Sequence, residues 1–185
     1  MLRLLLLTLT LTIISLLWAE DKEAPKEEKP DPIKQAHNYF ANDCNNQVWA
    51  LLDKQDRTPA DDEQLLYLAF ASAYHWSQVG SEQNHQRAEW LIARVYTVLA
   101  NKTEALQHAL RCQQLTEQNS PLMEDFDLAY CQECLARAYA LNKDKAQFAK
   151  YFQAASQAAE KIVNEEDRTQ FLSDLSGGNW FGMKQ

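Results

Sequence analysis

The scarcity of glycine and proline limits this chain more than any other feature of its sequence. Only four glycines occur in 185 residues, and three of them fall within the last nine. None of the five prolines lies between Pro59 and Pro121, and none follows Pro121. A β-rich fold needs glycine or proline turns about every 8–12 residues. The sequence therefore predicts an all-α fold.

Helical patterns continue from about residue 33 to residue 175. They predict about seven helices in stacked antiparallel hairpins, within one domain that we assign to residues 36–175. The clearest helix start is at Thr58, a capping residue that is followed by Pro59 at the first helical position. The predicted helices cover residues 37–52, 60–78, 82–100, 103–118, 123–141, 143–163 and 165–175.

The first 19 residues have the layout of a secretory signal peptide. Arg3 precedes an apolar run that ends at Trp18, and Ala19 is a suitable last residue before cleavage. A short membrane anchor is the alternative, although a spanning helix needs about 20 apolar residues. Residues 20–35 are charged and rich in proline, which is typical of a flexible linker. We therefore expect an exported protein, periplasmic or secreted, that touches a membrane only if the first segment is uncleaved.

The charge balance and the motifs limit the possible functions. The formal net charge is −8, whereas nucleic-acid binding needs a clustered basic face, so we expect no nucleic-acid partner. The acidic run of residues 61–63 could be mistaken for a metal or diphosphate site, but its place in a first helical turn indicates helix capping. No catalytic triad, phosphate loop or paired-carboxylate motif can be recognised. The sequence therefore predicts no enzyme, no cofactor and no metal site.

Two of the predicted hairpins repeat one arrangement of side chains. Ala93 precedes Tyr96 by three residues, and Ala136 precedes Tyr139 by the same spacing. A small residue lets two helices approach closely, and the tyrosine one turn further on fills the neighbouring gap. The partner helices carry Ala105, Ala109 and Cys112 in the first hairpin and Phe148, Phe152 and Ala155 in the second.

This arrangement resembles the tetratricopeptide repeat over residues 86–159. The resemblance implies stacked hairpins whose concave face binds a protein or peptide. The two units lie further apart than the family's usual spacing of about 34 residues, so the fourth helix or the loop after it must be long. The strings YHW, EWLIARVY, ALQHALRC and DFDLAY also resemble uncharacterised bacterial proteins of this repeat type. That second resemblance implies no activity.

A stripe of the predicted third helix provides candidate binding residues. Arg87, Trp90 and Arg94 are spaced three and four apart, so they share one helix face. In the resembled repeat this face lines the concave surface, and Arg137 holds the same place in the fifth helix. Arginine suits the recognition of carboxylates, and an indole adds an apolar anchor. We therefore predict a groove for an acidic or C-terminal carboxylate segment of a partner, unless nearby glutamates such as Glu133 satisfy these arginines internally.

A rival interpretation is a small-ligand-binding protein or enzyme. Its pocket would be built around His75, His85, Glu89 and Arg94. A deep enclosed cavity lined by these four residues would favour this interpretation, and an open groove would favour the scaffold.

The cysteines leave three interpretations open. Cys131 and Cys134 form a CxxC motif inside the predicted fifth helix, whereas a redox CxxC normally lies at a helix N-terminus, where the thiolate is stabilised. No second CxxC offers a partner for zinc. Structural thiols, which pack as small apolar groups, are the first interpretation. A disulfide from Cys112 to one of this pair is the second, and redox catalysis is the third.

Residues 176–185 form a tail of glycines and aromatic residues without a regular pattern. Trp180 and Phe181 can either fold back over the last helix or bind a partner. We expect the tail to fold back.

Overall fold

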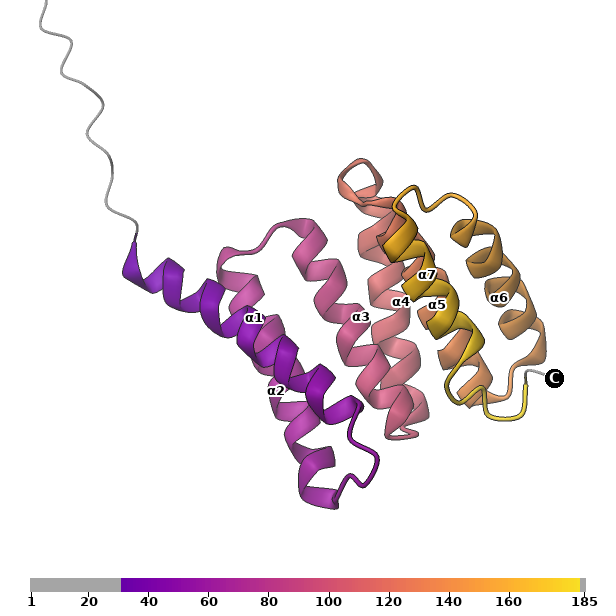
Figure 1. Cartoon of the computed structure of the whole chain (residues 1–185), viewed down its shortest axis with the longest axis horizontal. Helices are drawn as coiled ribbons and strands as arrows, with labels where there is room; N and C mark the ends of the chain where they lie inside the picture. Colours follow the sequence, from indigo (N-terminus) through magenta and orange to yellow (C-terminus); the bar gives the residue numbers. More distant parts are fainter. Residues whose placement is uncertain (1–30, 184–185) are drawn as a thin grey trace, which may run out of the picture. The chain divides into compact units, whose positions relative to one another are not determined.

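A computed structural model describes residues 31–183, and these residues form seven α-helices without a strand (Figure 1). The predicted all-α fold is confirmed. The predicted signal peptide, residues 1–19, and most of the predicted linker lie outside the described residues. The helices are α1 (Pro32–Leu52), α2 (Pro59–Val79), α3 (Glu82–Val98), α4 (Lys102–Gln118), α5 (Asp125–Asn142), α6 (Lys145–Ala159) and α7 (Glu165–Ser176).

The helices pack as successive hairpins, as predicted. The closest pairs are α1 with α2, α3 with α4, and α5 with α6. Each hairpin also contacts the next, because α2 packs on α3, α4 packs on α5, and α3 packs on α5. A short 3₁₀ turn, Ser120–Leu122, lengthens the connection between α4 and α5. The seventh helix packs on both α5 and α6.

Two helix boundaries differ from the prediction by more than two residues. Helix α1 begins at Pro32, before the expected start at His37, so the last residues of the predicted linker are helical. The Asp31 side chain accepts a hydrogen bond from the Ile33 amide at 2.9 Å, and proline is well suited to a first helical turn. Helix α6 ends at Ala159 instead of residue 163, because its last turn tightens through a hydrogen bond from the Ile162 amide to the Ala159 carbonyl.

The acidic run at the start of α2 has the capping role that its position predicts. The Thr58 amide donates to the Asp61 carboxylate at 2.7 Å, and the Asp61 amide donates to the Thr58 hydroxyl at 3.3 Å. The Lys54 ammonium also donates to this carboxylate at 2.7 Å. These hydrogen bonds lower the pKa of Asp61 to about 2, and the bond from Lys54 contributes most. The carboxylate therefore stays ionised at the positive end of the helix dipole.

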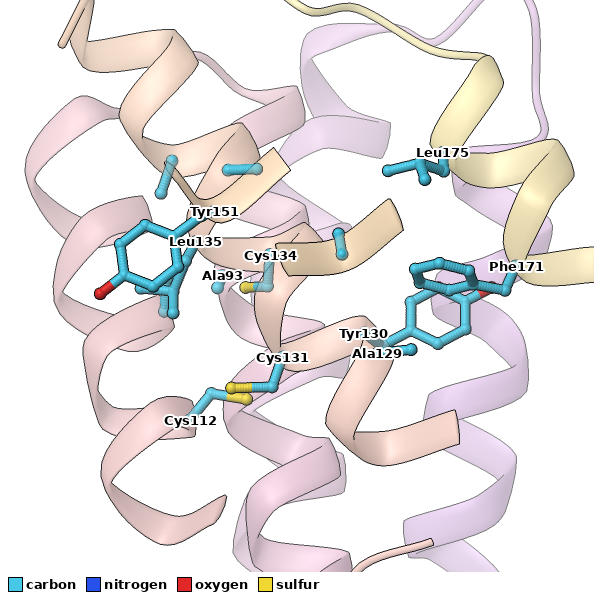
Figure 2. Packing of buried hydrophobic residues seen from close by; sticks show 14 of the residues in the cluster. Ala93, Cys112, Ala129, Tyr130, Cys131, Cys134, Leu135, Tyr151, Phe171 and Leu175 are labelled. Carbon is cyan, nitrogen blue, oxygen red and sulfur yellow. The ribbon is translucent and has the colours of Figure 1, made fainter. Parts of the chain in front are cut away.

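Two hydrophobic cores follow the hairpins. The first lies among α1, α2 and α3, with the buried side chains Val48, Leu65, Ala69, Leu91, Ile92 and Val95. The second extends from α3 to the tail and is rich in alanine and cysteine (Figure 2). Ala93 and Ala136 are fully buried in this second core. Because each presents a single methyl group, the helices that meet there can pack closely.

A buried ion pair on α5 holds the end of the chain in place. The Glu133 and Arg137 side chains, 1% and 3% exposed, form a salt bridge one helical turn apart. The Nη2 atom of Arg137 donates to the Asp174 carbonyl at 2.6 Å. The Arg137 guanidinium also lies 4.1 Å from the centre of the Trp180 ring. Trp180 is only 5% exposed. The tail therefore folds back, as expected, but Trp180 packs on Phe148 and Phe152 of α6 and on Arg137 of α5 instead of over the last helix.

Gly178 allows the tail to approach this guanidinium. Its φ angle is +71°, in the left-handed region that favours glycine. A Cβ atom at this position would lie 2.8 Å from a terminal nitrogen of Arg137. Another residue here would be strained at this φ and would force the end of the Arg137 side chain to shift, so glycine favours the closure.

We predict that Arg137→Met lowers the free energy of unfolding by about 3–5 kcal/mol, because it leaves the buried Glu133 carboxylate without its main partner. Adding Glu133→Leu should recover part of this loss, since no uncompensated charge then remains. Arg111→Met, which changes an exposed arginine, should stay within about 0.5 kcal/mol of wild type. Urea unfolding curves measure the wild type, Arg137→Met, Glu133→Leu alone, the double variant and Arg111→Met. Strictly additive losses in the double variant would contradict the pairing.

Candidate functional site

The main pocket of the described chain has a volume of about 630 Å³ and lies between α1, α3, α5 and α7. Ligand pockets in proteins typically measure about 300–1,000 Å³. Its lining comprises Asn45, Trp49, Leu52, Asp53, Arg57, Gln86, Arg87, Trp90, Arg94, Val98, Phe126, Asp127, Tyr130, Gln170 and Asp174. Aromatic and charged side chains therefore alternate around one cavity.

Aromatic rings from three helices form a continuous wall of this pocket. The Trp49 and Trp90 rings lie 5.6 Å apart, and the Trp90 ring meets Tyr130 edge-on at 5.0 Å. Tyr130 in turn contacts Phe126 at 4.6 Å. Such pairs prefer tilted or edge-to-face arrangements and hold one another in place. The wall therefore offers a preformed apolar surface to a ligand side chain.

Arg87 lines the pocket, but acidic groups of the chain already bind it. Its Nε donates to Asp127 at 2.6 Å, and a terminal nitrogen donates to Glu124 at 3.0 Å. Asp127 is 2% exposed and also accepts from Gln83 at 2.7 Å. The bidentate contact of Arg87 with the two carboxylate oxygens of Asp127 ties α3 to α5. Arg87 is thus mainly a bridge between helices.

Arg94 retains donor capacity. One of its terminal nitrogens lies 3.6 Å from Glu133, and its side chain is 20% exposed. The Nε of Arg94 and the Nε1 of Trp90 are both buried and have no hydrogen-bond partner among residues 31–183. Buried donors are nearly always paired in folded proteins. Two unpaired N–H groups therefore lie one turn apart on α3, in residues that both line the pocket.

The prediction that Arg137 joins the groove was wrong. Arg137 follows a small residue just as Arg94 does, but α7 and the tail cover it, and it does not line the pocket. The alternative was that acidic groups of the chain satisfy these arginines. This is correct for Arg137, which pairs with Glu133, and for Arg87, which pairs with Asp127. Of the four predicted residues, the pocket thus brings together Arg87, Trp90 and Arg94.

The four residues of the rival interpretation do not converge. The Nδ1 of His75 lies 2.9 Å from that of His37, and the Nε2 of His85 lies 3.1 Å from the Trp76 carbonyl. Glu89 instead pairs with the Nδ1 of His108 at 2.6 Å.

Arg94 alone of the four lines the main pocket. The predicted pocket around His75, His85, Glu89 and Arg94 is therefore wrong.

All four cysteines are buried free thiols. Cys112, Cys131 and Cys134 belong to the second core, where they occupy small-residue positions among the alanines (Figure 2). Burial is the main cause that raises the pKa of Cys134 well above its usual value. No cluster of three or more His, Cys, Asp or Glu side chains within residues 31–183 is placed to hold a metal ion.

Sequence analysis did not identify several walls of the pocket. Tyr130 was noted only within the string DFDLAY, and Trp49 was not singled out as a site residue. Gln170 and Asp174 enter from α7, and the Tyr130 hydroxyl donates to Asp174 at 2.5 Å. The periodicity of α7 shows which face is apolar but not which neighbour that face covers. No local signal could have placed α7 at the pocket.

Comparison with known proteins adds no relative. No family model, curated protein or solved structure matches the chain. The resemblance to the tetratricopeptide repeat therefore gains no support from known proteins. In the described part of the chain, none of the helices has the length and apolar character needed to cross a membrane.

We predict different consequences for the two arginines of the pocket. Arg87→Met should lower the free energy of unfolding by about 1–3 kcal/mol, because the buried Asp127 loses its charged donor. Arg94→Met should change it by less than about 1 kcal/mol, since its ion pair with Glu133 is long and Arg137 still pairs with that carboxylate. Urea unfolding with Arg111→Met as control measures both. Equal losses in the two variants would show that Arg94 is as structurally engaged as Arg87.

Proposed function

We propose that this protein is a non-enzymatic binding scaffold whose pocket takes an acidic or C-terminal carboxylate segment of a partner protein or peptide. The observation that carries the proposal is the partly exposed guanidinium of Arg94, which makes one long ion pair and lines the pocket beside an aromatic wall. A carboxylate accepts hydrogen bonds from a guanidinium in forked geometry. An apolar side chain next to that carboxylate would pack against the rings of Trp49 and Trp90.

The size of the pocket favours a chain end over a long segment. A volume of about 630 Å³ accommodates a few side chains. A terminal carboxylate also concentrates its charge on two oxygens that one arginine can bind. The end of a peptide therefore meets both the volume and the donor pattern of this site.

The chemistry of Tyr130 is consistent with a binding role. Burial, followed by the hydrogen bond to Asp174, raises the pKa of Tyr130 above its usual value. The hydroxyl therefore stays protonated at neutral pH and donates to Asp174 at 2.5 Å. Tyr130 and Asp174 then act together as a fixed wall of the pocket.

We expect Arg94→Gln to weaken binding of a carboxylate-ended peptide by about 10- to 100-fold, since hydrogen bonds to charged groups contribute about 1.5–3 kcal/mol. The probes are peptides selected from a library with free C-termini, each paired with its C-terminal amide. Fluorescence anisotropy measures the affinity of the wild type, of Arg94→Gln and of the control Arg111→Gln. The amide should bind less tightly than the acid, and the control should match wild type.

Equal affinities for acid and amide, together with no effect of Arg94→Gln, would rule the proposal out. Tighter binding of a free amino acid or short carboxylic acid than of any peptide would instead favour the small-ligand alternative. Raising the salt concentration should weaken the wild-type complex, because the recognition is partly ionic.

We further infer that the scaffold works outside the cytoplasm and that its hairpins are of the tetratricopeptide type. The apolar leader that ends at Ala19 supports export. We expect mature protein isolated from its native host to begin at Glu20. Intact-mass measurement tests this, and a full-length species that resists carbonate extraction from membranes would support the anchor instead.

A further inference from the structure

Two thiols face each other across the contact between α4 and α5. Cys112 on α4 and Cys131 on α5 share a hydrogen bond, and Figure 2 shows their sulfur atoms side by side. Both residues are 0% exposed. The Cys134 sulfur lies apart from this pair in the same view. The structure thus narrows the possible partner of Cys112 to Cys131.

Buried polar groups surround this pair. The Gln86 amide donates to the Cys112 sulfur at 3.3 Å and to the Thr116 hydroxyl at 3.1 Å. Two hydrogen bonds lower the pKa of Cys131: the larger effect comes from Cys112 and the smaller from Thr116. The hydrogen bond to Cys131, and then burial, raises the pKa of Cys112. Cys131 is therefore the thiol of the pair that ionises first, and the thiolate is the reactive form.

We propose that Cys112 and Cys131 form a disulfide that joins α4 to α5. The oxidant is a small disulfide of the glutathione class. The Cys131 thiolate attacks one sulfur of that disulfide, which forms a mixed disulfide and releases one thiolate. The Cys112 thiolate then attacks the Cys131 sulfur and releases the second. In total the protein loses two electrons and two protons, and the small disulfide becomes two thiols.

The crosslink would join the second and third hairpins of the stack. Helix α4 belongs to one hairpin and α5 to the next, and they are otherwise linked through the 3₁₀ turn at Ser120–Leu122. Because both sulfurs are buried, the exchange takes place while the chain folds or when α4 separates from α5. The inference does not depend on the proposed function, since neither cysteine lines the pocket.

The experiment refolds the full chain in a mixture of reduced and oxidised glutathione and then unfolds it in denaturant with iodoacetamide present, so that the remaining buried thiols are blocked as they become exposed. Trypsin leaves Cys112, Cys131 and Cys134 in one peptide, because it cleaves after Arg111 and Arg137. A protease that cleaves before aspartate separates Cys112 from the other two, since Asp125 and Asp127 lie between them. Mass spectrometry without reduction should find the two peptides joined.

Matched variants assign the bond. Cys134→Ala should keep the joined peptides, and Cys131→Ala should lose them. In the Cys134→Ala protein, oxidation should raise the melting temperature, because the crosslink restricts the unfolded chain. Four blocked thiols in the refolded wild type would overturn the proposal, and so would a bond from Cys134 to either other cysteine. The Cys134→Ala result decides the matter even if Cys131→Ala fails to fold, because Cys131 is then the one cysteine left in the peptide that follows Asp127.

Discussion

The buried carboxylate of Glu133 is the interaction on which both the end of the chain and the pocket depend. A charge taken out of water is costly unless it is paired, so this carboxylate requires cations beside it. Arg137 meets it from the next turn of α5, and Arg94 approaches it from α3. Arg137 also binds backbone carbonyls of α7 and the tail. One acidic group therefore links the interior of α5 to two otherwise separate regions.

A second buried carboxylate makes the same connection closer to the start of α5. Asp127 binds Arg87 and Gln83 of α3, and it also accepts a bond from the Glu124 amide at 3.1 Å. On the other side of these helices, alanines and cysteines allow close packing in the second core. Ionic contacts thus fix α3 against α5 on the pocket side, and small apolar residues do so in the core. This division explains why the pocket wall is both polar and well ordered in geometry.

Local signals carried most of the fold prediction. The scarcity of glycine and proline indicated helices, and Thr58 with Asp61 marked a helix start, because capping involves residues a few positions apart. The prediction was wrong for Arg137 because spacing on a helix gives the face of a side chain but not what covers that face. Asp127 and Asp174 reach the pocket through contacts about 40 residues apart in sequence. Such contacts depend on how whole helices pack, which no short motif encodes.

The position of α7 bears on when the pocket exists during synthesis. The fourth wall of the pocket consists of Gln170 and Asp174 of α7. Arg137 binds the backbone carbonyl of Asp174. The clamp also includes Trp180, which packs on the same guanidinium. A ribosome must therefore release the chain to beyond Trp180 before the cavity closes, although α3 and α5 emerge much earlier. A nascent or shortened chain carries Arg94 and the aromatic wall but lacks the wall that α7 provides, so the pocket is completed last.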